Sequence, residues 1–314
     1  MIRLTWLQFR VQAAAAAAVL AAAAVTLAVT GPRLARLCGA SGPAACQASY
    51  RPLQYLGYVL LAVPGIIGIF WGAPLITREL EAGTLRLAWS QSITRGRWLA
   101  VKLAVTCLAS MATAGLLSLM VTWWSSPVDT ASMSRFQVAM FGQRGIAPAG
   151  YTAFAFALGV GAGVLIRRTV PAMAATLAIF TAIQFTVPNW VRPHLATPLQ
   201  ITAAPGAVPI FGLTTPGPGP GPVTVGVSKL PDWITSVQVI DAAGHVASNV
   251  NTAACGNESP PACLSTLHLR LLISYQPASR YWAFQWAETA IYLALALALA
   301  GYCFWSIRRR RLSP

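Results

Sequence analysis

The chain has 314 residues, of which 56% are hydrophobic and only 9% are charged, and its formal net charge is +15. Soluble domains carry about 25% charged residues, so this composition argues against a soluble enzyme. A nucleic-acid-binding protein would need a soluble basic face, and no segment of the chain supplies one.

Six apolar stretches dominate the chain, each near the roughly 20 residues that a helix needs to cross a bilayer. A helix satisfies its own backbone hydrogen bonds, as the hydrocarbon requires. The sequence therefore predicts an all-α polytopic membrane protein with six transmembrane helices, over roughly residues 11–30, 54–77, 98–122, 150–166, 170–190 and 284–307.

The first 12 residues are amphipathic, because leucine and aromatic side chains alternate with Arg3, Gln8 and Arg10. Such a segment suits the membrane interface. We expect an interfacial elbow that leads into a retained first span rather than a cleaved signal peptide, whose apolar core would be shorter.

Basic residues alternate between the two sides of the predicted spans. If the N-terminus is inside, the short inside segments hold 13 of the 22 Lys and Arg residues. Enrichment of Lys and Arg in short cytoplasmic loops sets topology, so both termini are expected in the cytoplasm. The arginine- and alanine-rich composition suggests a bacterial source, which makes the bacterial plasma membrane the expected location.

The inside segment 78–95, between spans two and three, combines charge with helix-breaking residues. Glu79 and Glu81 are two of only seven acidic residues in the chain. Gly83 permits a break, and Thr84 can cap a following helix. Three-and-four spacing then gives one helical face, composed of Leu85, Ala88, Trp89 and Ser92. The segment is either an ordinary interfacial helix or a coupling helix on which a cytosolic partner docks.

Four of the six cysteines fall in outside loops, as two pairs with eight-residue separation. Local pairs on one face of the membrane indicate disulfides formed in an oxidising compartment. We predict Cys38–Cys46 and Cys255–Cys263. No cysteine or histidine spacing predicts a metal site.

The outside loop between spans five and six, residues 191–283, is long enough for a small domain. β-Branched runs predict strands over 234–240, from His245 onward and over 267–275, so we expect a β-rich extracellular insertion. The expected division is 1–190 for the elbow and spans one to five, 191–283 for the extracellular domain, and 284–314 for span six and a basic tail.

Two further features lie in the spans. Gln285 and Glu288 stand near the outer end of span six, where an ionisable group is costly and faces a cavity or a partner. They either border a substrate path or make a structural hydrogen bond. Gly159 and Gly163 form a G-x-x-x-G pair suited to close helix packing, although simple flexibility explains them equally well.

The run Arg78-Glu-Leu-Glu-Ala-Gly-Thr84, a following apolar helix, and Thr94-Arg95 before a span resemble the permease subunit of a type-2 ABC transporter. The closing stretch Tyr275–Glu288, followed by a span and four arginines, is similar to actinobacterial members of that family. The resemblance implies six spans, cytoplasmic termini and an E-x-G-T coupling segment. It assigns ATPase docking to a set of residues in that segment, namely Glu79, Glu81, Gly83, Thr84, Arg86, Trp89 and Arg95. Many members have a proline shortly before the arginine, whereas Ser92, Ile93 and Thr94 stand here.

The sequence contains no G-x-x-x-x-G-K-[ST] phosphate loop. The chain is therefore not expected to be an enzyme by itself. The resemblance implies a separate cytosolic ATPase subunit that binds ATP and Mg²⁺, and a dimeric membrane part formed with a second permease copy. Family bias favours export of drugs, antibiotics or lipids. An ion-coupled secondary carrier and a membrane-anchored scaffold that displays the external domain are the alternatives.

Overall fold

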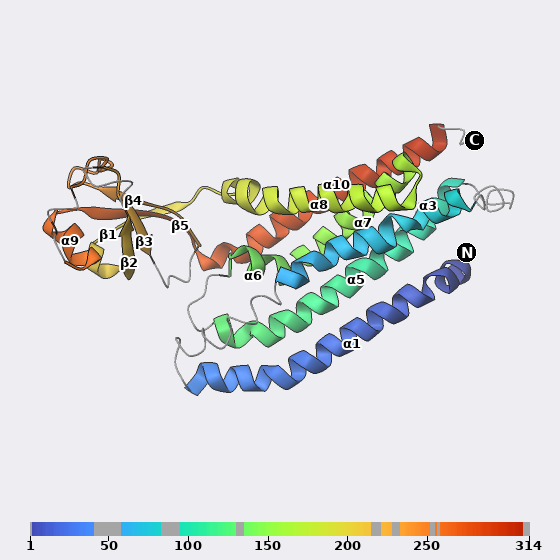
Figure 1. The fold of residues 1–314 in the computed structure, drawn as a ribbon, viewed down its shortest axis with the longest axis horizontal. Coiled ribbons are helices and arrows are strands. Elements are labelled where there is room, and N and C mark those ends of the chain that lie inside the picture. Colours follow the sequence, from blue (N-terminus) through green and yellow to red (C-terminus); the bar gives the residue numbers. More distant parts are fainter. Residues whose placement is uncertain are drawn as a thin grey trace. The chain divides into compact units, whose positions relative to one another are not determined.

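The structure is a computed structural model, mainly helical, with a small group of antiparallel strands (Figure 1). It divides into two compact units, which we describe separately. The helical unit contains residues 1–131, 138–192 and 282–314. The second unit contains residues 132–137 and 193–281 and is called the external unit here after the side predicted for it. The residues described are 2–40, 58–82, 95–129, 135–214, 221–227, 233–251, 255 and 258–309.

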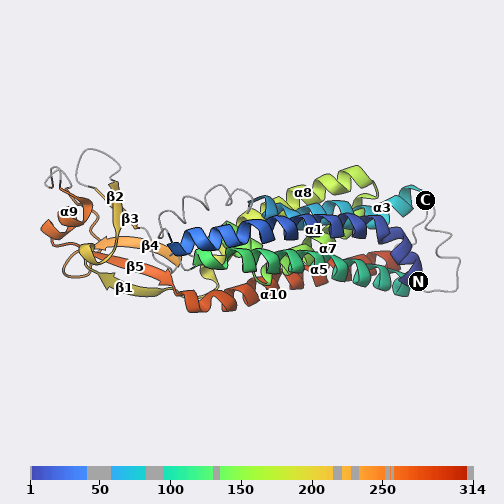
Figure 2. The same ribbon diagram turned by 90° about the horizontal axis from the view of Figure 1, so that it is seen from below.

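Six helical segments of the described chain are long and apolar enough to cross a membrane, which confirms the predicted number of spans. They cover Arg10–Cys38, Tyr58–Glu81, Leu99–Pro127, Ala147–Ile166, Thr169–His194 and Ala278–Ser306. The helices that form them are α1 (Ile2–Ala40), π-helix η1 (Gly68–Gly72), α3 (Pro74–Glu81), α5 (Arg95–Asp129), α7 (Ala147–Ile166), α8 (Thr169–Thr186), π-helix η2 (Val187–Val191), 3-10 helix η3 (Arg192–His194), 3-10 helix η6 (Ala278–Arg280) and α10 (Tyr281–Arg309). Figures 1 and 2 show the ends of α1 and α10 that carry the two termini at the same end of this unit.

Two details of the helical unit differ from the expectation. Residues 2–12, expected as a separate elbow, continue into span one as part of α1. The region 138–146, expected in an outside loop, begins with helix α6 (Val138–Gln143), whose residues 140–143 are buried. This run is too short to span a bilayer, so hydropathy alone does not separate it from a loop.

Helix α7 is the most buried span, with 83% of its most apolar window inside the bundle. Its glycines explain how other helices approach it. A Cβ atom at Gly159 would lie 2.3 Å from the carbonyl oxygen of Gly68, and one at Gly72 would lie 2.5 Å from that of Phe156. Helix η1 therefore packs backbone to backbone against α7. Gly163 makes a similar approach to Ala73 of span two, so the G-x-x-x-G pair serves close packing.

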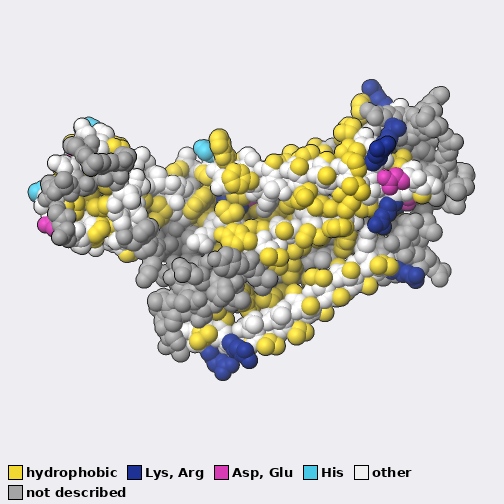
Figure 3. Space-filling model, viewed as in Figure 1, with side chains coloured by type: hydrophobic (Ala, Val, Ile, Leu, Met, Phe, Trp, Pro, Cys, Tyr) yellow, Lys and Arg dark blue, Asp and Glu magenta, His cyan; other side chains and the backbone are white. Residues whose placement is uncertain are grey.

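Lipid-facing side chains make up most of the remaining surface of the helical unit. Large apolar residues are exposed along every span, among them Val25, Phe70, Leu119, Phe185 and Leu297. Figure 3 shows apolar side chains covering the flank of the helices, with Lys and Arg gathered toward the ends. An apolar belt with basic ends is the pattern that a bilayer selects.

The external unit contains the small antiparallel sheet region that the sequence predicts between spans five and six. A three-stranded sheet has the order β1-β5-β4, and a separate hairpin pairs β2 with β3. The elements are β1 (Leu199–Ala203), 3-10 helix η4 (Pro205–Ala207), β2 (Ile210–Thr214), β3 (Thr224–Val227), β4 (Trp233–Ile240), α9 (Pro260–Thr266) and β5 (Arg270–Gln276). An apolar cluster lies among the described residues of this unit, centred on Val239, Leu264, Leu271 and Ile273.

The strands predicted over 234–240 and 267–275 correspond to β4 and β5, but the one predicted from His245 onward is wrong. That chain makes two isolated bridges, Ile240–Val246 and Gly221–Val250, and forms no strand over its described residues. A turn follows β4 at Asp241, whose carboxylate accepts hydrogen bonds from the backbone N–H groups of His245 and Ala243, each at 2.9 Å. These bonds lower the pKa of Asp241.

The Cys255–Cys263 disulfide is confirmed and joins the start of α9 to the chain before it. Cys38 is also disulfide-bonded, while its predicted partner Cys46 lies outside the described residues. Cys107 and Cys303, inside the third and sixth spans, are free thiols.

The glycine contacts generate a stability prediction. Gly159→Ala should lower the free energy of unfolding by about 1–3 kcal/mol, because the added methyl group meets backbone that cannot move aside. Gly161→Ala is the matched control, since its nearest neighbour across the interface is the side chain of Leu299 at 3.7 Å. Unfolding in mixed detergent micelles measures both variants, and equal stability of the two would contradict the packing account.

Candidate functional site

The end of span two that lies on the side of the two termini is bonded to span three through an ion pair. The ammonium group of Lys102 in α5 donates to Oε1 of Glu79 in α3. Both side chains are largely buried, with 8% and 18% exposed. Oε2 of Glu79 is buried and has no hydrogen-bond partner in the described structure. The pair fixes the last turn of α3 against α5.

The same end of α3 is bonded to α8 through Glu81. Its two carboxylate oxygens accept from the backbone N–H of Thr169 at 2.8 Å and from the Thr169 hydroxyl at 2.7 Å. Thr169 is the first residue of α8, where a carboxylate satisfies an unpaired N–H and suits the helix dipole. Arg168, one residue before Thr169, adds a favourable electrostatic interaction with Glu81. The Thr77 hydroxyl lies 2.8 Å from that of Thr169.

Most of the other residues predicted for coupling lie between α3 and α5. Gly83, Thr84, Arg86 and Trp89 lie outside the described residues. Arg95 is the first residue of α5, and its side chain is not described. Of the two ends of the segment, the first is fixed by bonds from α3 to α5 and α8, and the second is the start of α5 at Arg95.

A second polar cluster lies at the other end of the bundle. Glu288 of α10 binds the guanidinium of Arg192 through two hydrogen bonds, from Nε to Oε2 at 2.8 Å and from Nη2 to Oε1 at 3.0 Å. The hydroxyl of Tyr151 in α7 also donates to Oε1 of Glu288. All three side chains are at most 1% exposed. A bidentate pair in a dry site is the strongest form of this interaction.

Arg192 occupies a special place in the chain. It is the last residue of the helical unit before the external unit begins at Pro193, and α10 returns the chain from that unit. Its guanidinium carbon lies 3.9 Å from the ring centre of Phe141 in α6. Its Nη1 atom is buried without a hydrogen-bond partner in the described structure. The pair therefore joins the two chain connections to the external unit.

Gln285, one turn before Glu288, closes the polar cluster. Its Oε1 accepts from the backbone N–H groups of Ile146 and Ala147 at 3.2 and 2.9 Å, and its Nε2 donates to the carbonyl of Phe141 at 3.0 Å. These N–H groups belong to the first turn of α7, which has no capping side chain of its own. Gln285 thus fastens α6 and α7 to α10.

Sequence reasoning singled out Gln285 and Glu288 but missed Arg192 and Tyr151. The available signal was the cost of a buried carboxylate, which demands a cation near the same membrane depth. Arg192 follows span five directly, so it was the natural candidate. A role of Gln285 and Glu288 in a substrate path stays a prediction. Among the described residues, no group of three His, Cys, Asp or Glu side chains could hold a metal ion.

The Arg192–Glu288 pair yields a prediction. Glu288→Gln and Arg192→Met should each lower the free energy of unfolding by about 3–5 kcal/mol, because each leaves a buried group without its partner. The double variant should lose less than either single one, since no uncompensated charge remains. A double-mutant cycle in mixed detergent micelles measures the coupling, and additive losses would contradict it.

Comparison with protein families matches residues 17–192 to the family described as ABC-2 membrane transporter related. No curated protein and no solved structure matches the chain. The matched region is more than half of the 314 residues and holds the Glu79 and Glu81 contacts as well as Arg192. The chain therefore belongs to the ABC-2 membrane transporter related family, as the multi-pass membrane component of an ABC transporter.

Proposed function

We propose that the chain is the permease subunit of an ATP-driven exporter in the bacterial plasma membrane, with both termini in the cytoplasm. A separate cytosolic ATPase docks on the segment 78–95 between spans two and three. ATP and Mg²⁺ are bound by that subunit, because this sequence lacks a phosphate loop. A second permease copy, identical or related, completes the membrane part. Drugs, antibiotics or lipids are the proposed substrates.

The observation that carries this proposal is that the last turn of α3 is bonded to two other spans, through α5 and α8. A displacement imposed on the segment 83–94 acts on Glu81 at one side and Arg95 at the other. Through Glu79 it reaches Lys102 of α5, and through Glu81 it reaches the first turn of α8. An ordinary interfacial helix needs no such link between three spans, whereas a coupling helix does.

The ion-coupled carrier has less support from the described residues. A carrier of that class needs an ionisable group that exchanges its ion or proton with water. Glu288 is instead fully buried and held by Arg192 and Tyr151. Glu79 is held by Lys102 near the inner end of the bundle.

The coupling proposal is tested first on the ion pair. Glu79→Ala and Lys102→Met should both reduce stimulation of the co-expressed ATPase, and to a similar extent, because either change releases α3 from α5. Each should cost about 3 kcal/mol of stability, so expression in the membrane is matched before rates are compared. The double variant should be no worse than the single variants. Wild-type stimulation in Lys102→Met would show that Glu79 does not act through this pair.

Glu81 offers a matched comparison within one position. Glu81→Ala removes both acceptors for Thr169, whereas Glu81→Gln keeps one oxygen for the backbone N–H of Thr169. We expect Glu81→Ala to lower transport and ATPase stimulation while co-purification of the ATPase persists, and Glu81→Gln to retain most of both. If Glu79→Ala and Glu81→Ala both keep wild-type transport, assembly and ATPase rate, the segment is an ordinary interfacial helix.

A further inference from the structure

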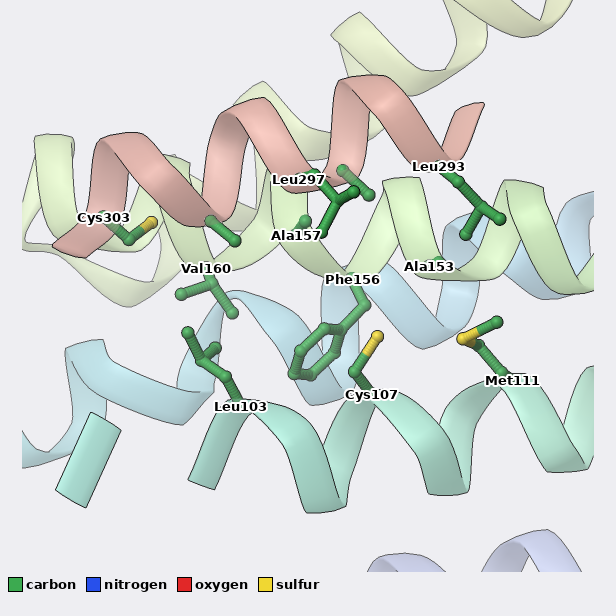
Figure 4. A pocket seen from close by; sticks show the side chains of 12 residues that line it. Leu103, Cys107, Met111, Ala153, Phe156, Ala157, Val160, Leu293, Leu297 and Cys303 are labelled. Atoms are coloured by element: carbon green, nitrogen blue, oxygen red, sulfur yellow. The ribbon is translucent and has the colours of Figure 1, made fainter. Parts of the chain in front are cut away.

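A hollow of about 250 Å³ lies between α5, α7 and α10 in the helical unit (Figure 4). Every side chain that lines it is apolar or a thiol: Leu103, Cys107, Met111, Ala153, Phe156, Ala157, Val160, Leu293, Ala296, Leu297, Ala300 and Cys303. Figure 4 shows the side chains of α5 facing those of α10 across α7, which forms the floor.

Small side chains create the hollow. Ala153 and Ala157 are four residues apart on α7, and Ala296 and Ala300 are four apart on α10, so each pair shares one helical face. Protein interiors are close-packed and contain few voids larger than a water molecule. Four alanines around one space therefore leave room for a group that the chain does not supply.

The lining identifies the chemistry of that group. A bound water needs two to four polar partners, and the walls offer none apart from two thiols. Leu297 is 73% exposed at the edge of the hollow, and Leu108, next to Cys107, is 64% exposed. Both leucines face the bilayer in a membrane-spanning bundle, so the hollow opens toward hydrocarbon.

Positive charge lies beyond one end of the hollow, where it suits an anionic group. Leu103 and Cys303 form that end. Six residues further along each helix, or about 9 Å at 1.5 Å per residue, stand the exposed arginines Arg97 and Arg309. The guanidinium carbon of Arg309 lies 5.1 Å from the ring centre of Trp305, an arrangement suited to the membrane interface.

The depth of the hollow also fits a lipid tail. Met111 and Leu293 close its far end, about 21 and 24 Å from Arg97 and Arg309 along their helices. One leaflet contributes about 15 Å of hydrocarbon beneath about 5–7 Å of headgroup region. Counted from arginines at the headgroups, the hollow begins about 9 Å down, among the tails of that leaflet, and ends near the bilayer midplane.

We propose that this hollow is a binding site for one acyl chain of an anionic phospholipid from the leaflet nearest the two termini, with its phosphate between Arg97 and Arg309. The inference goes beyond the proposed export function and needs no ATPase, so its test is independent of the coupling experiments.

The site is tested on the full chain purified in detergent. A phosphatidylglycerol with a photoactivatable group in the middle of one acyl chain is added, irradiated and mapped by mass spectrometry of peptides. We expect labelling within residues 103–111, 153–160 and 293–303. Unlabelled phosphatidylglycerol should compete better than phosphatidylcholine, and inorganic phosphate should not compete, because the tail supplies most of the binding.

Two variant pairs make the test specific. Ala157→Leu with Ala300→Leu fills the hollow and should reduce labelling roughly tenfold, equivalent to about two methylenes of lost burial, whereas Ala178→Leu on the exposed face of α8 should not. Replacing Arg97 and Arg309 by alanine should reduce the preference for phosphatidylglycerol over phosphatidylcholine roughly fivefold for each arginine. Arg33→Ala, toward the C-terminal end of α1, should leave that preference unchanged.

Equal labelling of the wild type and the filled variant would overturn the site. Equal competition by phosphatidylglycerol and phosphatidylcholine in the wild type would overturn the assignment of the phosphate to the arginines. The arginine variants change only surface side chains, so they keep the proposal open to refutation even if the filled variant fails to fold.

Discussion

The absence of water in the bilayer core is the constraint on which the rest of this structure depends. A polar or charged side chain placed there must find its partner within the protein. Lys102, Glu79, Arg192 and Glu288 obey this rule as two ion pairs, and Gln285 obeys it by binding backbone groups of α6 and α7. Because each partner comes from a different helix, satisfying the charges also ties the helices together. Polar groups that would be costly alone thus become the contacts that fix the arrangement of the spans.

These contacts gather at the two ends of the bundle, and glycine packing joins them. At the end near the termini, α3 is bonded to α5 and α8. At the other end, α10 is bonded to α7 and to Arg192. Between the two, Gly159 brings the backbone of α7 against that of η1, so span two and span four meet with no side chain between them. A path of direct contacts therefore runs from Glu81, at the end of α3, to Arg192, at the chain connection to the external unit. Such a path would suit the coupling role that we propose for the segment between spans two and three.

The sequence allowed the six spans, the sheet region between spans five and six and the Cys255–Cys263 disulfide to be predicted, because span length, β-branched runs and cysteine spacing are local signals. It did not reveal contacts between distant residues. The pairing of Arg192 with Glu288 joins positions 96 residues apart, and no periodicity encodes it. Helix α6 was missed because a short buried apolar run has no distinctive pattern, and β1 to β3 were missed because they lie among prolines and glycines that favour loops. Glu79 and Glu81 were singled out correctly as unusual acids, yet their partners, Lys102 and Thr169, could only be located in three dimensions.

The central claim is that the segment between spans two and three receives an ATPase, and photo-crosslinking in living cells tests it most directly. A photoreactive amino acid is placed at Trp89, with the same group at Arg33, at the opposite end of span one, as the control. The account predicts that Trp89, and not Arg33, cross-links to a protein whose sequence carries the G-x-x-x-x-G-K-[ST] phosphate loop. Cross-links from Trp89 to lipid alone, or equal cross-linking from both positions, would contradict it.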